Sequence, residues 1–124
     1  TMQKIHTNNA PEAIGPYSQA IEVNGMVFTS GQIAINPKSG NIEASDISGQ
    51  TKQVMENLTA VLSEAGTSMD KAGKTVCFLA DMGDFAEFNS IYGEYFTSKP
   101  ARSCVAAKEL PKGALVEVEV IAVK

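Results

Sequence analysis

Arg102 and Cys104 lie in the segment KPARSCV, and Glu117 and Glu119 follow in the segment LVEVEVIAV. Side chains of a strand alternate between its two faces, so Arg102 shares a face with Cys104, and Glu117 shares a face with Glu119. The planar guanidinium of arginine suits the binding of a carboxylate through two hydrogen bonds, which lysine cannot copy. Pro100 and the small residues that flank Arg102 would let a small anion reach it. An arginine and two carboxylates in one patch would make a site with both charges.

Whether these side chains share one patch depends on how the two segments pair. They are predicted to form an antiparallel hairpin, joined by a turn around PKG (111–113). Opposed residues of such a hairpin point to the same face, so an even number of loop residues brings Arg102, Cys104, Glu117 and Glu119 together. An odd number separates them. A cross-strand salt bridge on a solvated face is the simpler interpretation of the same residues.

Cys104 is not predicted to act as a nucleophile. A reactive thiol usually needs a nearby histidine or cation, and the only histidine, His6, lies at the far amino terminus. Cys104 is better interpreted as a small buried residue, and Cys77 as part of the core. Two distant cysteines and one histidine cannot assemble a zinc-binding set, so no structural metal is expected. Two unpaired thiols fit a reducing compartment.

Four further residues could line a site, and each has a structural alternative. Ser30 and Gly31 lie in TSGQ, where the glycine permits close approach of a ligand or forms a bulge. Tyr17 follows a Gly-Pro pair and is either a hydroxyl donor on a rigid turn or a packed aromatic residue. Asn89, on a predicted helix, is either a site residue or a solvent-facing side chain. The residues alone leave these alternatives open.

Composition indicates one packed domain over residues 1–124. Hydrophobic residues make up 44% of the 124, which is ordinary for a folded domain of this size. The formal net charge of -4 has the wrong sign for binding the nucleic-acid backbone by counterion release. No segment approaches the roughly 18 apolar residues of a membrane-spanning helix, and no signal peptide is visible. A cytoplasmic location is therefore expected.

Periodicity and turn signals predict the elements that would position these residues. Asn24-Gly25 is a strong hairpin signal, and Asp46 is a plausible N-cap for the first helix. Asp84 and Glu87 match a capping box at the start of a second helix. The aromatic face of this helix is interpreted as core that packs against the sheet. The expected strands cover residues 3–6, 18–23, 26–35, 74–82, 101–110 and 115–123, and the expected helices run from 46 to 66 and from 84 to a point before Pro100.

This order of elements indicates an α+β sandwich in which two helices cover one face of a mixed sheet. Val116, Val118 and Val120 alternate with Glu117 and Glu119 in the last strand. The second face of the sheet is therefore partly polar, although apolar side chains lie beside the two glutamates. We expect that face to form a subunit interface.

Several segments resemble the RidA family of reactive-intermediate deaminases. They are GPYSQA (15–20), SGQ (30–32), Asn89, PARSCV (100–105) and the terminal VEVEVIAV. PARSCV with a downstream glutamate is the most specific of them, and the others add weight by their position and order. The resemblance spans nearly the whole chain.

The resemblance implies a chorismate-mutase-like α+β fold and a homotrimer with three clefts between its subunits. It also implies hydrolysis of 2-imino acids, such as 2-iminobutanoate and 2-iminopropanoate, and of their enamine tautomers to 2-keto acids and ammonia, without metal or organic cofactor. By similarity, Arg102 binds the substrate carboxylate, Glu117 holds and activates water, and the Cys104 backbone contacts both. The other cleft residues implied by the family are Tyr17, Ser30, Gly31 and Asn89.

Two other functions compete with the deaminase. A ribonuclease or translation inhibitor would act on RNA, which the negative net charge and the lack of a histidine pair for acid and base roles disfavour. A small-metabolite-binding or chaperone-like trimer would use the same arginine without turnover. Catalysis on an imino acid separates this third function from the enzyme.

Overall fold

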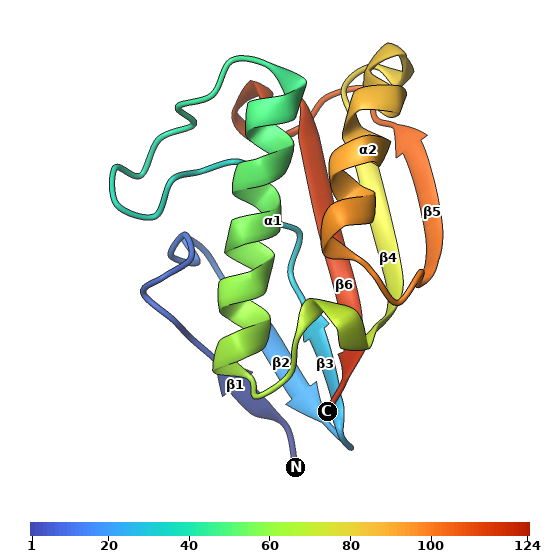
Figure 1. Cartoon of the computed structure of the whole chain (residues 1–124). Helices are drawn as coiled ribbons and strands as arrows, with labels where there is room; N and C mark the ends of the chain where they lie inside the picture. Colours follow the sequence, from blue (N-terminus) through green and yellow to red (C-terminus); the bar gives the residue numbers. More distant parts are fainter.

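A six-stranded mixed sheet carries two helices on one of its faces, as the sequence predicted (Figure 1). The computed structural model describes all residues from 1 to 124. Along the sheet the strands follow the order β1-β2-β3-β6-β4-β5, and only β4 and β5 run parallel. The strands are β1 (Gln3–Ile5), β2 (Ala20–Val23), β3 (Met26–Thr29), β4 (Ala72–Leu79), β5 (Ala101–Ala106) and β6 (Val116–Val123), and the helices are α1 (Ile47–Glu64) and α2 (Phe85–Tyr95).

The hairpin of β2 and β3 turns at Asn24-Gly25, as predicted. Both residues have positive φ, 51° and 74°, which suits the tight turns that join antiparallel strands. The second arm is shorter than expected, because it ends at Thr29 rather than continuing to residue 35. Beyond Thr29 the chain turns toward β6, where Gln32 makes an isolated bridge to Val118.

Helix α1 begins and ends close to the predicted bounds. The Asp46 side chain accepts a hydrogen bond from the Gly49 N–H at 3.0 Å, a cap that contributes about 1 kcal/mol in typical helices. Gly66 follows the helix with a φ of 84°, the left-handed conformation that glycine adopts most readily. The apolar stripe of the helix, including Val54 and Leu58, is fully buried against the sheet.

The capping box predicted for α2 is wrong. Asp84 has helical dihedral angles, φ -87° and ψ 0°, and its side chain makes no capping hydrogen bond. A single 3₁₀ turn, Met82–Asp84, precedes the helix, and its own cap is Asp81, whose carboxylate accepts from the Gly83 N–H at 2.7 Å. Glu87 instead accepts a hydrogen bond from the Ser48 hydroxyl of α1 at 3.0 Å. The chain therefore passes through this 3₁₀ turn directly into α2, without a side-chain cap at Asp84.

The hairpin predicted for the last two strands is also wrong. β5 pairs with β4 alone and lies at the sheet edge, whereas β6 lies on the other side of β4, between β4 and β3. β4, α2 and β5 form a parallel crossover unit, which places β5 beside β4. The segment between β5 and β6 then carries the chain past β4 through a 3₁₀ turn, Pro111–Gly113, in which Lys112 has a φ of 57°.

The helix-covered face of the sheet and the two helices enclose one cluster of 24 buried residues, among them Phe88, Leu62 and Val118. The opposite face, hereafter the open face, has no helix against it (Figure 1). Strand register and alternation put Phe28, Phe78, Val105 and Ile121 there, together with Glu117 and Glu119. Phe28 keeps 37% of its surface exposed and Val105 keeps 50%. Neither helix is long and apolar enough to cross a lipid bilayer.

A candidate active site in two halves

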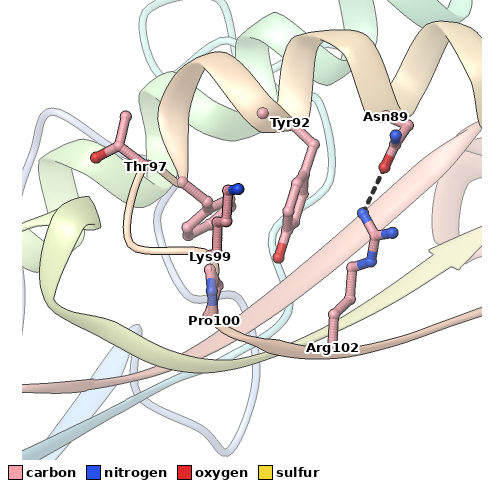
Figure 2. A pocket seen from close by; sticks show the side chains of 8 residues that line it. Asn89, Tyr92, Thr97, Lys99, Pro100 and Arg102 are labelled. Atoms are coloured by element: carbon pink, nitrogen blue, oxygen red, sulfur yellow. Dashed lines mark hydrogen bonds between the residues drawn. The ribbon is translucent and has the colours of Figure 1, made fainter.

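Arg102 and Asn89, two of the residues singled out from the sequence, meet between β5 and α2. The guanidinium Nη1 of Arg102 donates a hydrogen bond to Oδ1 of Asn89 at 2.7 Å (Figure 2). The guanidinium carbon lies 4.7 Å from the ring centroid of Tyr92 and 5.4 Å from that of Phe85, within the range of cation–π attraction. Three side chains of one helix therefore orient the cation.

A hollow of about 570 Å³ opens beside this arginine. Its walls come from the end of α2, the loop that follows it and the start of β5, and they contain no aspartate or glutamate. We call it the arginine half-site, and the residues that line it are Asn89, Tyr92, Gly93, Phe96, Thr97, Lys99, Pro100 and Arg102. Such a hollow, cationic and partly apolar, suits a small anionic ligand.

A second hollow, of about 480 Å³, contains Tyr17, Ser30, Gly31 and Glu117. We call it the glutamate half-site, and its other lining residues are Pro11, Glu12, Ile14, Gln32, Ile33, Ile35, Pro111 and Lys112. Four predicted site residues that are far apart in sequence thus share one hollow.

Buried Gln19 holds the loop that carries Tyr17 into the glutamate half-site. Its side chain accepts from the Thr7 N–H at 2.7 Å and donates to the carbonyl oxygens of Thr7 and Pro11 at 3.0 and 2.8 Å. Ser30 adds a hydrogen bond from its hydroxyl to the Ser18 carbonyl at 2.6 Å. The wall of the hollow is therefore fixed by hydrogen bonds between the Gln19 and Ser30 side chains and main-chain groups rather than by packing of Tyr17, whose side chain is 52% exposed.

Gly31 lies directly against the Glu117 carboxylate. A β-carbon at position 31 would overlap the Oε2 and Cδ atoms of Glu117, so any residue other than glycine would displace this carboxylate. Burial raises the pKa of Glu117, and the negative charge of nearby Glu119 raises it further. A carboxylate with a raised pKa is a stronger proton acceptor than an ordinary glutamate.

Cys104 lies on β5 with Arg102 but lines neither hollow. Burial raises the pKa of Cys104, and the nearby Arg102 charge offsets only part of that effect. Cys77, fully buried opposite Cys104 in the β4–β5 register, has its pKa raised to about 12, mainly by burial. Neither thiol is activated toward nucleophilic attack. No group of three or more His, Cys, Asp or Glu side chains is arranged to hold a metal ion.

The two half-sites lie on opposite faces of the same sheet. Arg102 is in register with Thr75, which is buried beneath the helices and hydrogen-bonds to Tyr92 at 2.6 Å. Glu117 is in register with Phe78, whose side chain points to the opposite face of β4 from that of Thr75. The expectation that Arg102 and Glu117 could share a patch on paired strands is therefore wrong for a single chain, because β4 separates β5 from β6.

The sequence analysis missed Tyr92 and Phe85 as partners of Arg102, because both belonged to an aromatic stripe interpreted as core. The spacing of Phe85, Asn89 and Tyr92, four and then three residues apart, places all three on one side of α2. The asparagine among these aromatic residues is the signal from which a polar partner of the helix, here Arg102, could have been predicted.

Comparison with known proteins supplies the family. The model of the endoribonuclease L-PSP family matches residues 7–124. The chain belongs to this family. A relative in Pyrococcus horikoshii, named as a RutC family protein, is 51% identical over 121 residues, which are 97% of this chain and 96% of the relative.

Solved structures of the L-PSP family share the whole fold. A Yersinia pestis protein of the conserved Rid protein family is 51% identical, with a TM-score of 0.97 over 100% of both chains. Escherichia coli TdcF, whose crystal structure contains bound serine, is 40% identical, with a TM-score of 0.94 over 98% of both chains. These matches confirm the RidA-type resemblance and the chorismate-mutase-like α+β fold that it implied.

Proposed function

We propose that this protein is a homotrimeric deaminase that hydrolyses 2-imino acids, with each active site formed between two subunits. The observation that carries the proposal is the division of the site. Arg102 and Glu117 each line a hollow of their own, on opposite faces of one sheet, and β4 keeps them apart within a chain. A second subunit that docks its glutamate half-site against the arginine half-site would complete the site.

The open face supports a closed ring of subunits. It exposes large apolar side chains on β3 and β5, including Phe28 and Val105, which a soluble monomer rarely presents together. In a cyclic assembly each subunit contacts its two neighbours through two different surfaces, and the ring is closed when every such surface is paired with its counterpart. A ring of three such chains would contain three equivalent sites.

The chemistry uses the parts that the two half-sites supply. Arg102 binds the substrate carboxylate through its forked N–H groups and so fixes the orientation of the imine carbon, C2. Water adds to C2 while Glu117 accepts one of its protons, and the nitrogen takes up protons and leaves as ammonia. A carbonyl oxygen from water replaces the nitrogen, which gives the 2-keto acid. No oxidation state changes in this sequence.

The remaining site residues position these groups. Gly31 lets Glu117 lie close to the backbone, and Asn89 orients Arg102. We assign Tyr17 and Ser30 to the wall facing the substrate, and the Cys104 backbone to contact with substrate and water. The serine bound by TdcF supports a site for small carboxylates with a nitrogen substituent at C2.

Two alternative functions compete with the deaminase, and a separate experiment tests each of them. An RNA-directed ribonuclease, which the family description names, is disfavoured by the net charge of -4 and by the single histidine. A small-metabolite-binding or chaperone-like trimer would keep the arginine half-site and bind carboxylates without turnover. A gel shift across salt concentrations tests the first, and the assay below tests the second.

We expect the protein to suppress semicarbazone formation from 2-iminobutanoate generated in situ by an amino-acid oxidase. Hydrolysis removes the imine before semicarbazide can trap it, so the semicarbazone absorbance should fall as the protein concentration rises. The Arg102→Ala variant should lose this effect, because the carboxylate is no longer held. Wild-type protein that assembles correctly but leaves trapping unchanged would contradict the deaminase and favour the binding function.

A further inference from the structure

The arginine half-site contains a second cation that the proposed reaction does not use. Lys99 lines the same hollow as Arg102, and no acidic residue lines it. The chain as a whole is acidic, with a net charge of -4. The only ion pair in the structure joins Lys124 to Glu22, so neither Lys99 nor Arg102 has a carboxylate partner. Two unpaired cations in one hollow favour a ligand with two negative groups.

The backbone holds Lys99 in an uncommon conformation beside the hollow. Its φ is 53°, in the left-handed region that residues other than glycine seldom adopt, and Pro100 follows it directly. The Lys99 N–H donates to the Phe96 carbonyl at 3.3 Å, which ties this turn to the end of α2. Strained positions of this kind persist where the surrounding structure enforces them, often at ligand-binding sites.

The Tyr92 ring lines the hollow together with both cations, and the Arg102 guanidinium carbon lies 4.7 Å from its centroid. In the view of Figure 2, Tyr92 lies between the Lys99 and Arg102 side chains, and Thr97 lies on the far side of Lys99. Only Pro100 and Ala101 separate Lys99 from Arg102 in the sequence, so their α-carbons lie at most about 11 Å apart. Because the Lys99 ammonium stands on a flexible four-carbon stem, it can reach the distal carboxylate of a four- or five-carbon ligand whose other carboxylate is bound by Arg102.

We propose that Lys99 makes this site selective for dicarboxylic 2-imino acids of four or five carbons, with Arg102 on the C1 carboxylate and Lys99 on the distal one. The selectivity for turnover rests on the proposed deaminase function. Hydrolysis itself is unchanged, since water adds to C2, the C–N bond breaks and ammonia leaves, giving a 2-keto dicarboxylate. The distal carboxylate takes no part in bond making, so Lys99 is a specificity residue and not a catalytic one.

A binding experiment tests the selectivity without turnover. The probes are 2-oxoglutarate and 2-oxobutanoate, which carry a ketone in place of the imine and differ in the distal carboxylate. By calorimetry the wild-type assembly should bind 2-oxoglutarate about tenfold more tightly, and Lys99→Gln should abolish that difference while leaving 2-oxobutanoate unchanged. Lys99→Arg should retain it. Lys52→Gln, the same change at an exposed position on α1 outside every hollow, is the matched control.

Kinetics then separate the two proposals. The substrates are 2-iminoglutarate and 2-iminobutanoate, made in situ by amino-acid oxidases and followed by semicarbazide trapping. Lys99→Gln should lower kcat/KM about tenfold for 2-iminoglutarate and less than about twofold for 2-iminobutanoate. An equal effect on both substrates, or a wild-type protein without preference in either experiment, would overturn the role of Lys99. If the binding preference depends on Lys99 but neither imine is hydrolysed, the dicarboxylate site stands and the deaminase proposal fails.

Discussion

Replacing Arg102 by lysine should lower kcat/KM for 2-iminobutanoate roughly 100-fold, the size of effect seen when a well-placed polar contact in an active site is removed. The native guanidinium offers two parallel N–H groups to a carboxylate, while Asn89 and Tyr92 fix its orientation. Lysine keeps the charge but presents a single ammonium on a flexible stem, so C2 of the substrate would no longer be held opposite the attacking water. Turnover in the trapping assay measures the loss.

The Arg102→Lys variant should keep the wild-type assembly and secondary structure. Arg102 is half-buried on an edge strand, and lysine keeps the charge and most of the aliphatic stem that packs beside Tyr92, so little packing is lost. Circular dichroism and light scattering that match the wild type would assign the lost activity to the arginine half-site. Near-normal turnover by Arg102→Lys would show that bidentate binding of the carboxylate is unnecessary.

Replacing Val105 by aspartate should give a folded monomer of 13.1 kDa with no measurable deaminase activity. Val105 lies in register with Phe78, which is in turn in register with Glu117, so one row of the open face crosses β5, β4 and β6. If this face packs against a neighbouring subunit, a carboxylate at position 105 would be buried without a partner, a cost of several kcal/mol. The monomer would retain every site side chain but only half of each site.

Size-exclusion chromatography coupled to light scattering measures the mass of this variant, and the trapping assay measures its activity. Val105→Thr is the matched control, because threonine has a similar shape, carries no charge and suits a strand. We expect it to remain trimeric and active. An active Val105→Asp monomer would contradict a shared site, and an unchanged trimer would place the interface elsewhere.

Local sequence signals predicted the parts of the fold that depend on neighbouring residues. The Asn24-Gly25 turn, the Asp46 cap and the apolar stripe of α1 each act within a few residues, and all three are present. The Asp84 capping box failed because the chain reaches α2 through a 3₁₀ turn, and a helical Asp84 cannot act as a cap.

The pairing of the last two strands depends on distant residues and was not readable from their own sequence. β5 and β6 are adjacent in the chain and alternate suitably for a hairpin, yet both pair with β4, which lies between them. Alternation within each strand correctly grouped Arg102 with Cys104 and Glu117 with Glu119. It could not show that the two pairs face opposite sides of the sheet, because that follows from the strand order.

The candidate site residues were therefore easier to identify than their arrangement. Tyr17, Ser30, Gly31 and Glu117 were singled out in separate segments, and they line one hollow. Lys99 is the first residue of KPARSCV but was not singled out, because its interest comes from a hollow shared with Arg102 and from its backbone conformation.

Mixing two inactive variants tests most directly whether each site takes Arg102 from one subunit and Glu117 from its neighbour. Arg102→Ala and Glu117→Gln would be co-expressed with different tags, and mixed assemblies purified through both tags. Random assembly of equal amounts gives about one quarter of the sites an intact Arg102 and an intact Glu117, when the two come from different subunits of a ring. Deaminase activity should therefore return to about one quarter of the wild-type value before tag selection, and somewhat more after it. Arg102→Ala mixed with the double variant Arg102→Ala/Glu117→Gln should stay inactive, because no subunit then supplies the arginine. Mixed assemblies of the two single variants that remain as inactive as either parent would contradict a site shared between subunits.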